Sequence, residues 1–210
     1  MMKNHMIKDA LTLFVITLIA GLALGAVNYI TKEPIAQAKE KARNEAYVKV
    51  LPEAVSFTDS YGDEVKTSAS LLHASGDLEN VTIDACVTGL DAAGNVAGYI
   101  VSATCSESYG GDIGIAVGFK ADLSISSIEV LTINDTPGLG MKAKEEGFRG
   151  QYSGALSYPY TITTSGKSAA GEIDAISSAT ITSKAFNKAV NASALFIRIA
   201  LSTEGGNADE

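Results

Sequence analysis

The chain has 210 residues, of which 46% are hydrophobic and 19% are charged, and its formal net charge is −8. A chain of this length can bury one ordinary hydrophobic core. Twenty glycines with only four prolines indicate a globular domain rich in turns rather than a disordered or collagen-like chain. The acidic balance leaves no basic patch to neutralise the phosphates of a nucleic acid, so nucleic-acid binding is not expected.

The first strong pattern is an apolar stretch, residues 10–31, that contains no charged residue. About 20 helical residues, each rising about 1.5 Å, span the hydrocarbon core of a membrane, which is about 30 Å thick. We therefore predict one transmembrane helix over this stretch. Because Lys3, His5 and Lys8 precede it, residues 1–9 are predicted to be cytoplasmic and the rest of the chain to lie on the other side. A cleaved signal peptide is the alternative, although the apolar run is longer than a typical signal core.

The next stretch, residues 32–52, reads "KEPIAQAKEKARNEAYVKVLP" and predicts a connector helix. Pro34 is expected in its first turn, and Pro52 is expected to end it. The apolar side of this helix is thin and consists largely of alanine, which suits a connector better than a core helix. Residues 53–80 are mixed and polar and predict only turns.

Alternating apolar residues then predict a sheet. Four strand-like segments joined by short turns lie between residues 81 and 133, and they predict an antiparallel arrangement. A further strand at residues 158–164, "YPYTITT", is expected to join this sheet. From about Ser183 the apolar residues recur at helical spacing, which predicts a closing helix laid on the sheet. The fold class is therefore α+β, with the folded domain over residues 53–202 and a flexible tail over residues 203–210.

The two cysteines are expected to be free and buried. They lie in segments that should pair as a hairpin, and the turn between them places Cys86 opposite about Ile100. Cys105 is then too far away for the Cα separation of about 4.4–6.8 Å that a disulfide requires. Neither cysteine belongs to a C-x-x-C pair, and His5 and His73 lie far apart in the sequence, so no zinc or iron–sulfur site made by this chain alone is expected.

The candidates for function are three short stretches rich in glycine or hydroxyl groups. They are "SYGGDIG" (108–114), "NDTPGLGMK" (134–142) and "DAISSATITS" (174–183). Each follows or precedes a predicted strand, where the loops of a sheet can converge on a ligand. In "TPGLG", Gly138 and Gly140 permit backbone shapes closed to other residues and leave room for a flat ligand. Taken alone, a tight turn explains the second stretch and a helix N-cap explains the third.

Taken in order, with the membrane span and the connector helix, these motifs resemble one family closely. "YGG", "TPGLG" and D-x-x-S-S-A-T-x-T-S resemble the FMN-binding domain shared by the G subunit of the Rnf electron-transport complex and the C subunit of the sodium-pumping NADH:quinone reductase. In that family a flavin transferase attaches FMN through its phosphate to the last threonine of an S/T-G-A-T motif. The resemblance implies that Thr180 bears FMN and that Asp174 belongs to the motif read by the transferase. Ser178 stands where the family usually has glycine, and Asp135 stands where it commonly has glutamate.

The local chemistry agrees with this implied role. A phosphoester needs an accessible hydroxyl with small neighbours, and a threonine at a helix start places the phosphate charge beside free amides. The flavin ring is expected to lie against the "NDTPGLG" and "YGG" loops. Lys167 is either a contact to a flavin carbonyl or phosphate, or a solvated surface lysine. The expected cofactor-binding residues are Thr180, Ser177, Ser178, Ala179, Asp135, Thr136, Gly138, Leu139, Gly140, Tyr109, Gly110 and Lys167, and no catalytic or metal-binding residue is expected.

The resemblance implies an electron-carrier subunit of a membrane-bound Rnf-type ferredoxin:NAD oxidoreductase coupled to Na⁺ or H⁺ translocation. It implies a single-pass protein of the bacterial cell membrane, with an extracytoplasmic FMN-binding domain, that is not catalytic alone. Its partners would be the other membrane and peripheral subunits and a flavin transferase for maturation. The short chain favours the Rnf protein over its relative in the quinone reductase. A membrane-anchored protein that binds a loose ligand without a redox role is the alternative of another class.

Overall fold

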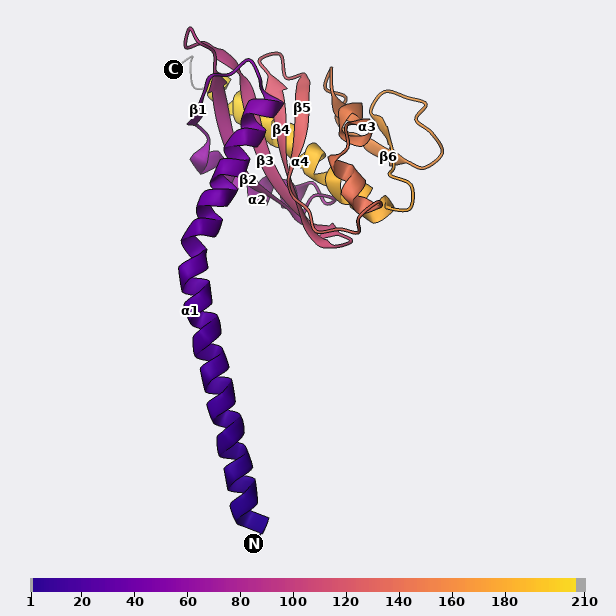
Figure 1. Cartoon of the computed structure of the whole chain (residues 1–210). Helices are drawn as coiled ribbons and strands as arrows, with labels where there is room; N and C mark the ends of the chain where they lie inside the picture. Colours follow the sequence, from indigo (N-terminus) through magenta and orange to yellow (C-terminus); the bar gives the residue numbers. More distant parts are fainter. Residues whose placement is uncertain (1, 207–210) are drawn as a thin grey trace. The chain divides into compact units, whose positions relative to one another are not determined.

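The computed structural model of the chain describes residues 2–206, and the order of its helices and strands can be followed in Figure 1. The chain divides into two compact units, Met1–Arg43 and Asn44–Glu210. Helix α1 (Met2–Val50) accounts for the described part of the first unit and contributes its last residues to the second. The folded domain of the second unit holds all three candidate stretches.

Among the described residues, one helix is long and apolar enough to cross a membrane, and it is α1 from Lys8 onward. Its most apolar window has a mean hydropathy of 2.5. The hydroxyls of Thr12, Thr17 and Thr31 each donate to a carbonyl one turn earlier in the helix, at 2.8 to 3.0 Å. The hydroxyls of these three threonines therefore find hydrogen-bond acceptors within the helix, as the interior of a membrane requires.

The predicted connector does not begin a new helix at Pro34. Helix α1 is continuous through this proline, which lies in its interior, so the prediction of a first-turn position was wrong. The preceding residues are already helical, and the missing N–H of the proline removes one hydrogen bond from a helix that continues on both sides. The helix ends at Val50, just before Pro52, as predicted.

The domain is built on a five-stranded antiparallel sheet in the order β1-β2-β3-β4-β5. The four strands predicted between residues 81 and 133 are confirmed, and β1 adds a fifth at the edge. The side chains of β3 and β4 alternate between two buried clusters, one on each face of the sheet. The strands are β1 (Ser56–Asp59), β2 (Val81–Leu90), β3 (Val96–Ser108), β4 (Gly111–Lys120) and β5 (Ile125–Thr132).

Two helices cover the faces of this sheet. The last turn of α1 packs on one face, where Tyr47 and Val50 join Ile100 and the Tyr47 hydroxyl lies 3.0 Å from that of Ser102. Helix α4 (Thr180–Gly206) packs on the other face and supplies much of the main core. The closing helix is thus confirmed, although it begins three residues before Ser183. Residues 203–206 are helical rather than a tail, and residues 207–210 lie outside the described residues.

The strand expected at residues 158–164 does not join the main sheet. Instead β6 (Thr161–Thr163) pairs in parallel with β7 (Glu172–Asp174) in a separate two-stranded sheet. The backbone of Tyr160, just before β6, is held by side chains of α4. Asn191 accepts the Tyr160 N–H at 2.8 Å, and Asn187 donates to the Tyr160 carbonyl at 2.9 Å. These amides take the place of a neighbouring strand, so the prediction was wrong for a reason that lies far away in the sequence.

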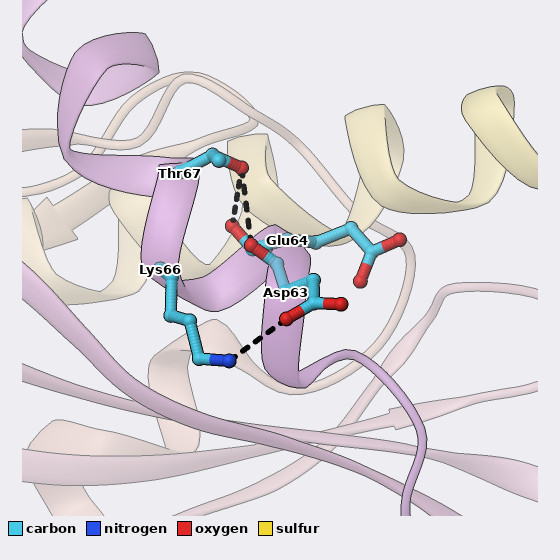
Figure 2. Close-up of polar contacts among 4 residues, drawn as sticks. All are labelled: Asp63, Glu64, Lys66 and Thr67. Atoms are coloured by element: carbon cyan, nitrogen blue, oxygen red, sulfur yellow. Dashed lines mark hydrogen bonds and ion pairs between the residues drawn. The ribbon is translucent and has the colours of Figure 1, made fainter.

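The polar stretch 53–80 contains regular structure that the sequence pattern does not reveal. Besides β1 it holds α2 (Gly62–Ala74), whose first turn carries Asp63 and Glu64, where acidic side chains favour the helix dipole. Lys66 donates to the Asp63 carboxylate at 2.8 Å, and the Thr67 hydroxyl donates back to the carbonyls of Asp63 and Glu64 in the first turn (Figure 2). The helix is stabilised locally on its exposed side and anchored by few apolar residues, Leu72 among them.

The register of the hairpin differs by one residue from the prediction. Cys86 lies opposite Val101 rather than Ile100, because β3 carries one extra residue where Gly89 pairs with Gly98 and Leu90 with Val96. Neither cysteine forms a disulfide and both are buried, as predicted.

Short helical segments connect the sheet to the remaining loops. They are η1 (Gly140–Lys144), α3 (Glu146–Arg149) and η2 (Gly150–Tyr152). Arg149 donates to the Ile128 carbonyl at the open edge of β5 and pairs with Glu129 at 2.6 Å. The edge strand is thereby covered by the segment that follows the "TPGLG" motif.

Candidate functional site

The three candidate stretches meet at one cavity of about 280 Å³. Tyr109 comes from the β3–β4 turn, a second wall comes from the loop of residues 135–140, and the third comes from the first turn of α4. The cavity therefore brings together eight of the twelve predicted residues, and it adds two that the sequence analysis missed, Ile181 and Thr182. Its lining is Tyr109, Asp135, Thr136, Leu139, Gly140, Ser178, Ala179, Thr180, Ile181 and Thr182.

Two of the other predicted residues lie at a second cavity. Ser177 and Lys167 line a space of about 460 Å³ together with Asp174 and Lys142. The chain turns between Ser177 and Ala179, so the two halves of "DAISSAT" face different cavities. One carboxylate oxygen of Asp174, Oδ1, is buried and has no hydrogen-bond partner among the described residues.

The two remaining predicted residues, Gly110 and Gly138, act through the backbone. A Cβ at Gly110 would overlap the carbonyl of Asn134, so this glycine allows the β3–β4 turn to pack directly on the 134–140 loop. Gly138 has φ of +78°, which only glycine adopts without strain. Gly140 lies against the side chain of Asp135, because a Cβ there would overlap the carboxylate. Gly138 thus has a backbone shape closed to other residues, as predicted, and the room left by Gly140 is filled by the Asp135 carboxylate.

Ser178, where the related motif usually has glycine, is in the left-handed region with φ of +62°. A side chain in this conformation costs about 1–2 kcal/mol relative to glycine. The conformation reverses the chain between β7 and α4, and this reversal brings Thr180 to the first turn of the helix. Serine therefore fills this position at some cost, and glycine would fill it without that strain.

Two hydroxyls of the motif make hydrogen bonds within the domain. Ser183 accepts a hydrogen bond from the Ile176 N–H at 2.9 Å and donates to the Ala179 carbonyl at 3.0 Å, and its side chain is buried. The hydroxyl of Thr182 donates to Oδ2 of Asp135 at 2.5 Å. The helix-cap interpretation of this stretch thus applies chiefly to Ser183, which stabilises the turn before α4.

The hydroxyl of Thr180, in contrast, makes no hydrogen bond to another described residue. Within residues 2–206, the side chains of Ser177, Ser178 and Thr180 make no hydrogen bond. Ser178 and Thr180 line the smaller cavity, and Thr180 is the first residue of α4. A partly exposed threonine hydroxyl without a partner is therefore presented to the cavity at a helix N-terminus.

The backbone amides beside this hydroxyl are also free. In the described part of the chain, the N–H groups of Thr180, Ile181 and Thr182 make no hydrogen bond, because the residues four positions earlier lie outside the helix. They stand at the positive end of the dipole of a 27-residue helix. Hydroxyl, amides and dipole together form a site that suits a phosphate.

Three apolar side chains in the lining of the cavity are exposed. Tyr109 is 71% exposed, Ile181 is 54% exposed and Leu139 is 39% exposed, and all three line the cavity. Aromatic and aliphatic side chains around a few convergent polar groups are typical of a small-molecule site. A flat ring system would cover part of this exposed apolar surface.

Polar contacts farther along α4 fix the helix that carries the site. Lys188 pairs with Glu107 at 2.6 Å, and the hydrogen bonds from Lys188 and Asn80 hold the pKa of Glu107 below its ordinary value. The same pair raises the pKa of Lys188. The Tyr152 hydroxyl donates to Asn187 at 3.3 Å, and burial raises the pKa of Tyr152 well above its usual range, so this group stays a neutral donor.

Comparisons with known proteins agree with this geometry. The profile of an FMN-binding domain matches residues 108–194, and that of the RnfG N-terminal region matches residues 1–50. The G subunit of the Na⁺-translocating ferredoxin:NAD⁺ oxidoreductase complex of Acetobacterium woodii is 32% identical over 188 residues, which cover 89% of this chain and 88% of the relative. The chain belongs to the RnfG family of ion-translocating oxidoreductase complexes. The part of this RnfG-family chain matched by the FMN-binding profile contains all three walls of the cavity.

A second relative of this RnfG-family chain has nearly the same identity, and a solved structure is more distantly similar. The G subunit of the proton-translocating ferredoxin:NAD⁺ oxidoreductase complex of Clostridium ljungdahlii is 30% identical, covering 87% of this chain and 90% of the relative.

The crystal structure of the C subunit of the Na⁺-translocating NADH-quinone reductase from Parabacteroides distasonis has a TM-score of 0.46 and 22% identity, covering 54% of this chain and 60% of the other. The apolar helix α1 fits membrane anchoring of a protein that belongs to a complex.

Proposed function

We propose that this chain is the electron-carrier subunit of a membrane-bound Rnf-type ferredoxin:NAD oxidoreductase and that it carries FMN through a phosphoester to Thr180. One observation carries the proposal. The hydroxyl of Thr180 has no partner among the described residues and faces the cavity where the three motifs of the family meet. The FMN-binding profile over residues 108–194 supports the choice of cofactor.

The residues of the cavity fit the two halves of FMN. The free amides at the start of α4 favour the remaining phosphate charge, and Ser178 and Ala179 leave room beside Thr180. Tyr109 and Leu139, with Ile181 opposite the loop, offer apolar surface to the ring. The flavin supplies the electron transfer, and the protein supplies position and electrostatics.

Attachment requires access for a flavin transferase. The donor would be a flavin whose phosphate is activated as a pyrophosphate: the bond from Thr180 Oγ1 to the flavin-side phosphorus forms, the P–O bond of the pyrophosphate breaks, and the displaced phosphate monoester leaves with the threonine proton. Ser177 and Ser178 are exposed, so the approach to Thr180 is not covered within the domain. On the other side of the turn, the unpartnered Oδ1 of Asp174 is able to accept a hydrogen bond from the transferase if the second cavity opens to it. Lys167, which lies at this second cavity, is proposed to serve maturation rather than to contact the flavin ring.

The membrane arrangement is part of the same proposal. Helix α1 anchors the chain, the basic residues before its apolar stretch keep residues 1–9 in the cytoplasm, and the domain lies outside. The partners are the other proteins of the complex. Two relatives of nearly equal identity are named for Na⁺ and for proton translocation, so we expect the coupling ion to depend on partner subunits.

The test is expression of the full chain with and without a flavin transferase. We expect a fluorescent band under ultraviolet light on a denaturing gel only with the transferase, and tandem mass spectrometry should place FMN on the peptide that contains Thr180. A band without fluorescence would favour the alternative, an anchored protein that binds a loose ligand. Proteins that copurify distinguish a ferredoxin:NAD complex from a quinone reductase, and a reporter fused to the C-terminus reads out which side of the membrane the domain occupies.

A further inference from the structure

The carboxylate of Asp135 joins three segments of the cofactor cavity. Its Oδ1 accepts the N–H of Thr136 at 2.6 Å. Its Oδ2 accepts the hydroxyl of Thr182 at 2.5 Å and, at 3.5 Å, that of Ser108. Both oxygens are therefore occupied by groups from the end of β3, the 134–140 loop and the first turn of α4. Asp135 was predicted as a cofactor contact, and in the domain as it stands each of its carboxylate oxygens already accepts a hydrogen bond from a protein group.

The surroundings of Asp135 are shaped to hold the carboxylate in this place. A Cβ at Gly140 would overlap it, so the glycine leaves the space that the carboxylate fills. Asp135 is half-buried and Thr182 is 1% exposed, which protects their hydrogen bond from competition with water. Hydrogen bonds to a carboxylate are among the stronger ones in proteins.

The first turn of α4 depends on such contacts, because the residue before it, Ala179, has no side chain that can cap the helix. Ser183 ties the turn to Ile176 on the chain just before it. Thr182 ties the turn to Asp135, a residue 47 positions away, and this is the side that faces the cavity. Thr180 lies between these two attachments and has no side-chain hydrogen bond of its own within the described chain.

We propose that Asp135 and Thr182 are positioning residues of the cofactor site: their hydrogen bond fixes the first turn of α4 so that the Thr180 hydroxyl is held at the cavity for FMN attachment. The proposal rests on the proposed function for its consequence, but the bond itself is a feature of the unloaded domain. The carboxylate has a second effect. It places a negative charge in the cavity wall, which opposes the addition of electrons to a flavin bound there.

The first experiment measures the rate of FMN attachment to the full chain in the presence of a flavin transferase. Thr182→Val keeps the shape of the side chain and removes the hydroxyl, so attachment should slow by about tenfold, the value of one hydrogen bond to a charged group. Thr182→Ser keeps the hydroxyl and should restore most of the rate. Thr67→Val deletes a hydroxyl that bonds only within the exposed helix α2, and it is the matched control (Figure 2).

The second experiment follows the unloaded chain in detergent by hydrogen–deuterium exchange. Thr182→Val should speed exchange in peptides covering residues 134–141 and 176–184, and Thr182→Ser and Thr67→Val should not. If wild-type chain never acquires FMN while this difference is seen, the proposed function fails and the positioning contact stands. If wild type is loaded but Thr182→Val matches it in both attachment and exchange, the positioning role is overturned.

The third measurement distinguishes the effect of the Asp135 charge from that of the hydrogen bond between Asp135 and Thr182. Asp135→Asn removes the charge with little change of shape, so the midpoint potential of the loaded protein should shift in the positive direction. Thr182→Val keeps the charge and should shift the potential much less. Equal potentials for wild type and Asp135→Asn would remove the electrostatic part of the proposal.

Discussion

The first turn of α4 and the remainder of the same helix use their side chains in opposite ways. In the first turn, Thr180 and Thr182 face a cavity and a loop, and the Thr180 hydroxyl has no partner among the described residues. From Ala185 onward the helix buries mostly apolar side chains against the sheet. One continuous helix thus divides two tasks between its parts. The first turn presents the group for cofactor attachment, and the buried side chains farther along stabilise the packing of the helix on the sheet.

The largest expected effect is on the first turn. Thr180→Val should abolish covalent FMN, since the hydroxyl that forms the phosphoester is gone, while the free energy of unfolding of the unloaded chain should change by less than about 0.5 kcal/mol. Gel fluorescence and denaturant titration measure the two quantities. Persistent fluorescence would move the attachment to another hydroxyl, and Ser178→Ala and Ser177→Ala are the matched variants that should stay fluorescent.

The opposite result is expected for the body of the helix. Phe186 is fully buried, and the centroid of its ring lies 5.1 Å from the ring centroid of Phe148 and 5.5 Å from that of Tyr152. Phe186→Ala should lower the free energy of unfolding by about 3–5 kcal/mol, and flavin attachment should fall only as the folded fraction falls. If this variant does not fold, Phe186→Leu should give a smaller loss, and attachment that failed in a stably folded variant would contradict the separation.

Ser183 lies where the two parts of the helix meet and should show a smaller effect. Ser183→Ala leaves the Ile176 N–H buried without its acceptor, which costs about 1–2 kcal/mol of unfolding free energy. Thermal unfolding of the unloaded chain measures it. An unchanged stability would mean that water replaces the hydroxyl and that Ser183 is not the main support of the turn.

Replacing Ser178 by glycine is expected to raise the free energy of unfolding. Ser178→Gly relieves a left-handed serine, but glycine also loses more freedom on folding, so the net gain should be about 0.5–1 kcal/mol. Denaturant titration of the unloaded chain tests the sign, with Ser177→Gly as the control at the neighbouring position. A loss of stability at Ser178→Gly would show that the serine side chain makes a contribution of its own.

The smallest effect concerns pH. The pKa of Glu107 is lowered by Lys188 and Asn80, so this group adds stability above its unfolded pKa and loses that contribution as the pH falls through its folded value. Lys188 has a raised pKa and remains charged throughout that range. Because the pair is partly exposed, Glu107→Gln should cost only about 0.5 kcal/mol near pH 7, and the difference should vanish under acidic conditions. An undiminished difference at low pH would point to packing instead.

Regular patterns made part of this structure predictable. Alternation identified the strands between residues 81 and 133, and helical spacing identified α4. The motif resemblance identified most of the cavity lining. The polar helix α2 was not predicted, because it has too few apolar residues to show helical spacing. The strand at residues 158–164 was assigned to the main sheet, whereas the side chains of Asn187 and Asn191 bind the backbone just before β6.

The contacts missed at the site share a physical cause. Thr182 and Asp135 lie 47 positions apart, and no local pattern relates a threonine on a helix to an aspartate in a distant loop. The register error at Cys86 has a different cause: one inserted residue in β3 shifts the pairs from Gly89 to Ala85, and a second irregularity between Ile83 and Ala85 restores the register. Periodicity reports which face of an element is buried, but it does not report which side chain reaches across to another element.

The two contacts that hold the first turn of α4 differ in when they can form. The contact of Ser183 closes a loop of 7 positions, whereas that of Thr182 spans 47 and needs the sheet edge and the 134–140 loop in place. Long-range contacts carry a larger loop-closure entropy and form late in folding. The Thr180 hydroxyl should then be presented to a transferase only after the domain has acquired its topology. Pulse labelling would test this order, with flavin fluorescence expected to appear after protease resistance, so that maturation selects correctly folded chains.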